Sequence, residues 1–344
     1  MSRNFFVKNG YRSIRLILSS KGDYSQKDSE WNYSDIPHLN YIHSRVEGIT
    51  LKASRTHISN IFLQRVGPFE IPASVNISHL TAGKHEYIMT ILNIGISVVT
   101  SHKNDSDGCL TTTTYEFFYK DLAGFIMCLL ARMTTRKNYR ILMSEDMPMR
   151  IQRGILRRKG IGFKLDTLDL IGFTDTLDIS CNNIECGSAL QANEEFRIEV
   201  TGLSGSIDTA NDLLRVEWRD NNLLIVPKIC PHEGAPLAHK QTHMHSADHL
   251  HDCLLCPWHG RKIGPVARMN LLDEEKLDFC IYHRQFSIKK TKCALDKQSG
   301  LSYEITLRLK GPEIRCKPLQ KNDKRYDCEL DSNETRINHK GDSG

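Results

Sequence analysis

The chain has 344 residues, a formal net charge of +5, and 40% hydrophobic and 25% charged residues. This length exceeds what a single hydrophobic core usually serves, so we expect two domains of ordinary globular composition. The positive charge is mild and spread along the chain, which argues against a nucleic-acid partner. No apolar stretch approaches the roughly 18 residues of a membrane span, so we expect none.

Eleven cysteines are the next compositional signal. In a small secreted chain they would indicate disulfides, but this chain is large and the count is odd. The first residues, MSRNFFVKNGYRS, also lack the apolar run of a secretory signal. We therefore expect reduced thiols and a cytoplasmic location.

The predicted elements of the first half change in kind along the chain. An apolar run at residues 14–18 predicts an opening strand, and Ser34 or Asp35 is expected to cap a short helix. From about residue 48 to 118, segments rich in β-branched and aromatic residues alternate with turn residues, which is typical of an antiparallel sheet. Apolar residues at helical spacing then predict a long helix over about 121–158, which Pro148 kinks or splits. These elements outline a helix-grip fold, in which the helix covers a sheet curved around a cavity.

The second half reads as a different kind of domain. Gly160 and Gly162 mark a linker, after which short strand-like segments such as LLRVEW, NLLIV and YEITLRL predict an all-β domain. Residues 320–344 are polar and predict a disordered tail. The expected fold class is α+β, with a helix-grip domain over 1–162, an all-β domain over 163–319 and the tail over 320–344.

Two short loops of the second half combine cysteine with histidine. Cys230-x-His232 and Cys256-x-x-His259 are separated by 23 residues. In a Rieske [2Fe–2S] centre two thiolates bind one iron and two imidazoles bind the other, so each loop must supply one of each. The spacing of this motif therefore predicts such a cluster.

Zinc is the alternative metal for this region. Cys253, Cys256 and the histidines of the insert 239–251 offer enough ligands for a tetrahedral site. Zinc does not require a proline after each cysteine, nor the glycines that follow the histidines, Gly234 and Gly260. The pattern therefore favours iron and sulfide. The His-rich insert is interpreted as a solvated loop rather than a second metal site.

This pair of loops resembles those of the Rieske superfamily. High-potential members carry one more cysteine in each loop and a serine, whereas this chain has Ala235, Trp258 and Arg261 at those places. The resemblance therefore implies the low-potential branch, which contains oxygenase components and soluble ferredoxins. One departure is Glu233, which stands where many oxygenases have arginine.

A second candidate metal site lies in the first half, at Asp35-x-x-His38-x4-His43. Two imidazoles and a carboxylate leave open positions on a non-haem Fe(II) ion. A spacing of five puts His38 and His43 about 140° apart on a regular helix, so they converge only if the helix ends between them. Asp146 is the best candidate for the carboxylate and Glu145 the second, since adjacent helical residues point about 100° apart. Otherwise Asp35 caps a helix and the histidines are half-buried polar residues.

Together the two motifs resemble Rieske non-haem iron oxygenases, whose catalytic domain is START-like and helix-grip. The resemblance implies that electrons from a reductase or ferredoxin pass through the cluster to a mononuclear Fe(II). There O₂ would oxidise a mainly hydrophobic small molecule, by hydroxylation, demethylation or desaturation. It also implies a homo-oligomer such as a trimer, in which Asp35 joins an iron-bound histidine to a cluster-bound histidine of a neighbouring subunit. The usual domain order is reversed here. The rival interpretation is a Rieske electron carrier fused to a non-catalytic START-like lipid-binding domain.

Overall fold

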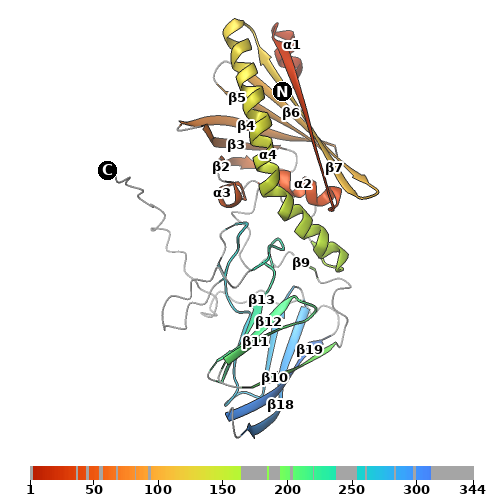
Figure 1. The fold of residues 1–344 in the computed structure, drawn as a ribbon, viewed down its shortest axis with the longest axis vertical. Coiled ribbons are helices and arrows are strands. Elements are labelled where there is room, and N and C mark those ends of the chain that lie inside the picture. Colours follow the sequence, from red (N-terminus) through yellow and green to blue (C-terminus); the bar gives the residue numbers. More distant parts are fainter. Residues whose placement is uncertain are drawn as a thin grey trace, which may run out of the picture.

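The computed structural model describes residues 3–310 except 36–37, 44–45, 54–56, 67–68, 82, 92–93, 164–183, 186–193, 202–203, 220, 238–253, 260–261, 283 and 297–299. Two bodies follow one another along the long axis of the molecule (Figure 1). The predicted tail, the His-rich insert, Gly260 and Arg261 all lie outside the described residues. None of the described helices is long and apolar enough to cross a membrane.

The first body is a seven-stranded antiparallel sheet in the order β1-β7-β6-β5-β4-β3-β2. Its strands are β1 (Arg12–Gly22), β2 (Val46–Ala53), β3 (His57–Val66), β4 (Phe69–Thr81), β5 (Lys84–Ile91), β6 (Ile94–Asp105) and β7 (Gly108–Tyr119). Alternation gives each strand two faces: on β1, Leu16 is buried whereas Ile17 is 62% exposed. The predicted opening strand and the antiparallel sheet are confirmed.

Four helices accompany this sheet: α1 (Arg3–Lys8), α2 (Gln26–Ser34), α3 (Leu39–Ile42) and α4 (Leu122–Arg158). The expected helix start at Ser34 or Asp35 is wrong, because α2 ends there. Ser25 is the cap instead: its hydroxyl accepts from the Asp28 N–H while the Asp28 carboxylate accepts from the Ser25 N–H. This reciprocal pair caps the helix just before its first residue, Gln26, and Asp35 is the C-terminal cap.

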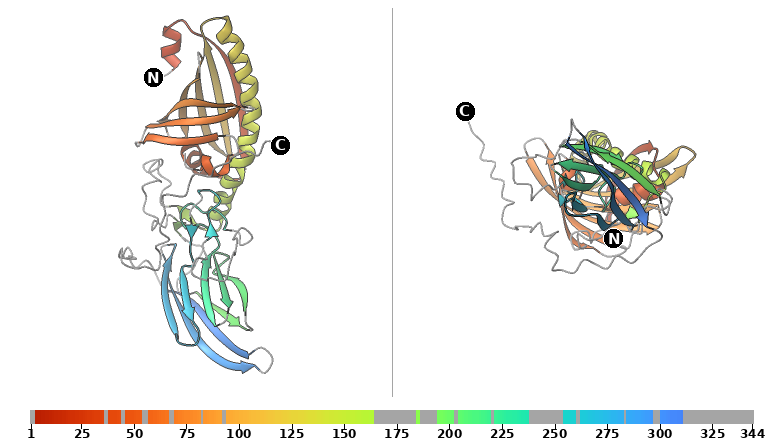
Figure 2. Two further views of the ribbon diagram at one scale, coloured as in Figure 1. Left: turned by 90° about the vertical axis from the view of Figure 1, so that its left-hand side faces the viewer. Right: turned by 90° about the horizontal axis from the view of Figure 1, so that it is seen from below.

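The long helix α4 begins and ends close to the predicted residues. Asp121 caps it by accepting a hydrogen bond of 2.7 Å from the Gly124 N–H. Pro148 lies inside α4 and does not split it. Met149, Arg150 and Arg153, in the turns that follow, are buried, so tertiary packing holds the helix together where one backbone hydrogen bond is lost. Cys128 packs α4 onto Leu16 and Phe117 of the sheet, which gives an α+β body with the predicted helix-over-sheet arrangement (Figure 2).

The described part of the second body consists of β-strands and the turns between them. Its larger sheets have the orders β10-β19-β18-β17 and β11-β12-β13-β16, and β14-β15 and β8-β9 are two-stranded. The strands are β8 (Gly162–Phe163), β9 (Ile184–Glu185), β10 (Glu195–Val200), β11 (Ser204–Thr209), β12 (Leu214–Arg219), β13 (Asn222–Pro227), β14 (Leu254–Leu255), β15 (Lys262–Ile263), β16 (Ala267–Asn270), β17 (Lys276–Ile281), β18 (Arg284–Asp296) and β19 (Gly300–Lys310). Val216, Ile225, Phe286 and Leu307 are among its buried core residues.

Candidate metal centres

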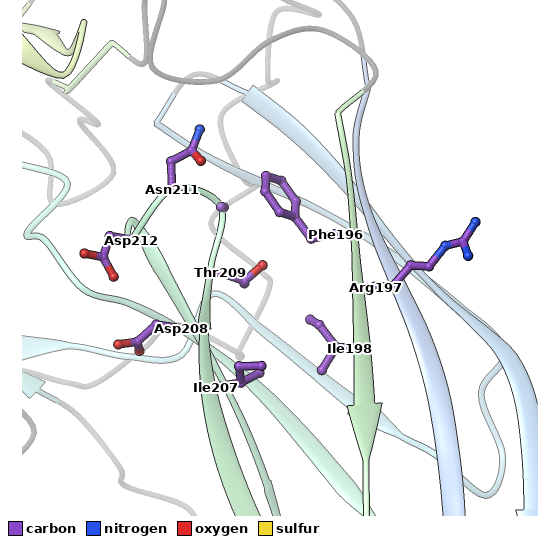
Figure 3. Close-up of a pocket in the computed structure, with 9 residues that line it drawn as sticks. Phe196, Arg197, Ile198, Ile207, Asp208, Thr209, Asn211 and Asp212 are labelled. Carbon is purple, nitrogen blue, oxygen red and sulfur yellow. The ribbon is translucent and has the colours of Figure 1, made fainter.

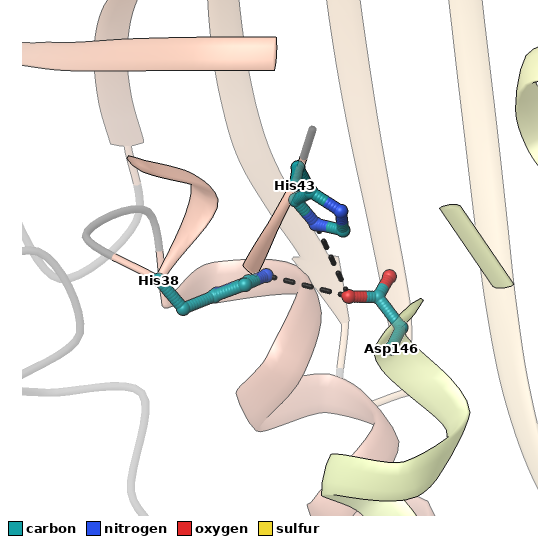
Figure 4. Close-up of side chains that lie close together, drawn as sticks. All are labelled: His38, His43 and Asp146. Carbon is teal, nitrogen blue, oxygen red and sulfur yellow. Dashed lines mark ion pairs between the residues drawn. The ribbon is translucent and has the colours of Figure 1, made fainter. Parts of the chain in front are cut away.

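The structure brings His38, His43 and Asp146 together in the first body. One ligand atom of each lies within 4.8 Å of the others (Figure 4). Helix α3 is a single turn, with His38 just before it and His43 just after it. The chain therefore leaves the helix on both sides, which allows two side chains five residues apart to face Asp146 on α4.

Neighbouring groups orient two of these three side chains. Glu145 lies 2.8 Å from Nδ1 of His43 and so directs the Nε2 atom, 3.2 Å from Asp146 Oδ1, toward the centre. Arg150 donates to the other Asp146 oxygen, Oδ2, at 3.3 Å. Asp146 is thus part of the group, and Glu145 supports it from the far side of His43.

The donor set fits a mononuclear iron. The ring nitrogens of the buried His38 have carboxylate oxygens of Asp146 and Asp35 at 3.4 and 3.7 Å but make no hydrogen bond among the described residues, although buried polar atoms usually make one. Burial opposes the charge on Asp146, but the nearby imidazoles and Arg150 outweigh it and hold the pKa of the carboxyl well below its usual range. Two imidazoles and an ionised carboxylate are ligands that Fe(II) takes.

The second group consists of Cys230, His232, Cys256 and His259, all of them buried. The two histidine rings lie 5.2 Å apart between centroids. The first loop is tied by Cys230, whose N–H donates to Ala235 at 2.7 Å and whose carbonyl accepts from Gly234 at 2.9 Å. Gly234 has φ +84°, so glycine suits this turn. The hairpin of β14 and β15 flanks the second loop.

These four side chains suit a [2Fe–2S] cluster by their chemistry. Both cysteines are free thiols. The adjacent Cys230 thiol, and less strongly His259, lower the pKa of Cys256 although burial opposes ionisation, while Cys256 and burial raise the pKa of Cys230. Nδ1 of His259 is buried and has no hydrogen-bond partner among the described residues. Two thiols and two imidazoles are the ligand set of a Rieske cluster.

Asp35 lies between the two groups. Its Oδ2 atom is 2.7 Å from Nε2 of His259 and 3.7 Å from Nδ1 of His38. Burial opposes ionisation of Asp35, but the two imidazoles outweigh it and hold the pKa of the carboxyl well below its usual range. The contact that we expected across a subunit interface is therefore made within one chain.

A buried joint holds the two bodies in this arrangement. Trp31 of α2 packs on Trp258 with ring centroids 5.6 Å apart. Arg153 of α4 donates to Glu233 at 2.6 Å and to Asp28 at 3.2 Å, and its guanidinium lies over the Trp31 ring. Sequence reasoning noticed Glu233 as a departure but missed Arg153. The sequence did not show that Glu233 is buried, and only this burial reveals its need for a cation from elsewhere.

One pocket lies apart from both groups, in the second body between β10 and β11 (Figure 3). It has a volume of about 400 Å³ and is lined by residues such as Phe196, Ile198 and Asp208. Asp208 is already paired with Arg215 and Lys228, at 2.6 Å each. No cysteine or histidine lines this pocket, so the candidate chemistry lies elsewhere.

No family model matches the chain, and no curated protein matches it. Solved structures of similar shape include the Zhui aromatase/cyclase from Streptomyces sp. R1128, at 8% identity over 43% of this chain and 96% of that one, with a TM-score of 0.35. A START superfamily protein from Mycobacterium smegmatis shares 10% identity over 39% and 96%, with a TM-score of 0.32. Norcoclaurine synthase from Thalictrum shares 12% over 42% and 97%, with a TM-score of 0.33. Structural similarity this weak gives no information about the activity of this chain.

Proposed function

We propose that the protein is an O₂-dependent Rieske non-haem iron oxygenase. The observation that carries this proposal is the position of Asp35 Oδ2, which faces His259 of one candidate metal group and His38 of the other. A carboxylate placed between two metal-bound imidazoles, hydrogen-bonded to His259 and in ion-pair contact with His38, links two centres through a short path. A structural cap would not need a histidine from each group.

The chain's own residues would hold both centres and keep them dry. The [2Fe–2S] cluster would be held by Cys230, His232, Cys256 and His259, and the iron by His38, His43 and Asp146. Asp35 would fix the orientations of the His38 and His259 rings. When bound, the cluster supplies single electrons and the iron supplies open positions for O₂. Every one of these side chains is buried, so water is largely excluded from the path between the centres.

The apolar side chains beside the iron group support an apolar substrate. Leu39, between the two histidines, packs against Val75 and Ile77 on the sheet face that carries Tyr87 and Met89. A mainly hydrophobic small molecule would match these neighbours. The electron donor would be a separate reductase or ferredoxin, and the cytoplasmic location and a homo-oligomer remain predictions. Because Asp35 and His259 belong to the same chain, the proposed path needs no second subunit.

The test is an anaerobic metal and sulfide analysis of the whole protein, with visible and EPR spectra. We expect about two irons and two acid-labile sulfides per chain, plus up to one further labile iron. Zinc without sulfide would end the proposal. A cluster without the labile iron would instead support the rival, an electron carrier fused to a lipid-binding domain.

Matched variants separate the two centres. His43→Ala should lose the labile iron and leave the cluster spectrum intact, whereas Cys256→Ser should lose sulfide and the visible bands. Glu145→Ala should only weaken the labile iron, by about 10–100-fold in affinity, because it orients His43 without reaching the centre. If His43→Ala and an exposed control, Asp23→Asn, lost labile iron to the same extent, the first group would hold no metal.

A further inference from the structure

The N-terminal half of α4 presents an apolar stripe that nothing in the described chain covers. Its members are separated by helical spacings and are exposed to the following extents: Leu122 74%, Ile126 51%, Leu129 38%, Leu130 53% and Met133 72%. At 100° per residue all five lie within an arc of about 100°. Exposed apolar residues normally occur singly, so a continuous stripe on one helix marks an interaction surface.

Cations continue the same face of the helix. Arg136, Lys137 and Arg140 follow the stripe in the next two turns and are exposed. Their helical angles fall in or beside the arc of the stripe. No acidic residue occurs between Asp121 and Glu145, a run of 23 residues in a chain with 41 Asp and Glu. This part of the helix is therefore apolar at one end and cationic at the other, and it carries no acidic side chain of its own.

The stripe lies at one end of the molecule. Figures 1 and 2 show the start of α4 and α1 at the end of the long axis that faces away from the second body. Phe5 and Val7 of α1 are also exposed there, at 47% and 54%. This end can therefore touch an extended surface while the candidate metal centres and the second body remain clear of it.

We propose that this end of the protein docks on an anionic phospholipid membrane surface. The apolar turns would enter the boundary between headgroups and acyl chains, and the cations one or two turns further along would meet the phosphates. A second copy of the chain fits less well, because a self-complementary contact along the face would bring cations together without carboxylates to pair with them. The inference does not rest on the proposed oxygenase function.

The test is sedimentation of the whole purified protein with phosphatidylcholine vesicles, with and without phosphatidylserine. We expect binding that requires phosphatidylserine and weakens as salt rises. The triple variant Leu129→Gln, Leu130→Gln and Met133→Gln should lose at least about tenfold in binding. Neutralising Arg136, Lys137 and Arg140 with glutamine should lower binding to the anionic vesicles by about fivefold per charge.

The control variant is Leu272→Gln, which removes a leucine that is 56% exposed in the second body. It should bind vesicles like the original protein. Equal binding to both kinds of vesicle, or a loss as large in the control as in the triple variant, would overturn the proposal. So would a triple variant that keeps vesicle binding but sediments as a smaller oligomer, because the stripe would then be an interface between copies. Metal and sulfide contents, measured on the same samples, report separately on the oxygenase proposal.

Discussion

Asp35→Asn is the change that most directly tests communication between the two candidate centres. The Asp35 carboxylate makes a 2.7 Å hydrogen bond to His259. Hydrogen bonds to charged groups contribute about 1.5–3 kcal/mol, which corresponds to about 10–100-fold in the population of the bonded arrangement. Asparagine is neutral, and its amide would occupy the place of Oδ1, which is buried and has no hydrogen-bond partner among the described residues. We therefore expect electron passage between the centres to slow by at least about tenfold.

The assay is single-turnover oxidation of the reduced cluster by O₂, followed through its visible absorption in protein loaded with both metals. Iron and sulfide contents should equal those of the original protein, because Asp35 ligates neither centre. Asp23→Asn is the matched control, since that carboxylate is 68% exposed and pairs only with Arg158 in the described contacts. Unchanged oxidation in Asp35→Asn would refute the bridge and leave Asp35 as a helix C-cap.

Three further substitutions test how buried residues of the first body contribute to the stability of the fold. Arg153→Met removes a buried guanidinium 2.6 Å from Glu233, so urea titration should show a loss of about 3–5 kcal/mol in the free energy of unfolding. Gly154→Ala places a methyl group 2.5 Å from the carbonyl oxygen of Asp23 and should cost about 1–3 kcal/mol in the same titration. Burial is the main cause that lowers the pKa of His102 to about 2 in the folded chain. On acidification the imidazole is therefore protonated in the unfolded chain at a higher pH than in the folded chain. The contribution of His102 is fully present above about pH 6.5 and is lost by about 1.4 kcal/mol per pH unit below it. His102→Gln should therefore flatten the fall in stability between pH 7 and pH 5; an equally steep fall would contradict this.

The sequence predicted those parts of the fold whose signals are local. The helical spacing of apolar residues predicted α4 with nearly its observed bounds, and β-branched runs predicted most strands. The strand β11, SGSIDT, was missed because small polar residues carry little strand preference. The start of α2 was misplaced, although Ser25 and Asp28 form a readable capping pair; two later capping residues competed with it.

In the candidate site too, the residues with a local sequence signal were predicted, and those placed by tertiary packing were not. The loops of Cys230 and Cys256 could be found from spacing alone, since each ligand pair lies within four residues. The choice of Asp146 over Glu145 depends on how α4 is rotated against the sheet, which only tertiary packing decides. That His259 reaches Asp35 in the same chain depends on the joint at Arg153 and Glu233, which no local pattern reports.

Helix α4 also sets the distance between the candidate iron group and the contact of Arg153 with Glu233. Asp146, Arg150 and Arg153 are four and three residues apart, so they share one face and reach the iron group and the joint together. Inserting one residue between Asp146 and Arg153 would turn one against the other by about 100° and shift it by about 1.5 Å. Inserting seven would restore the angle but separate them by about 10 Å more. The segment between Asp146 and Arg153 therefore tolerates neither an insertion nor a deletion.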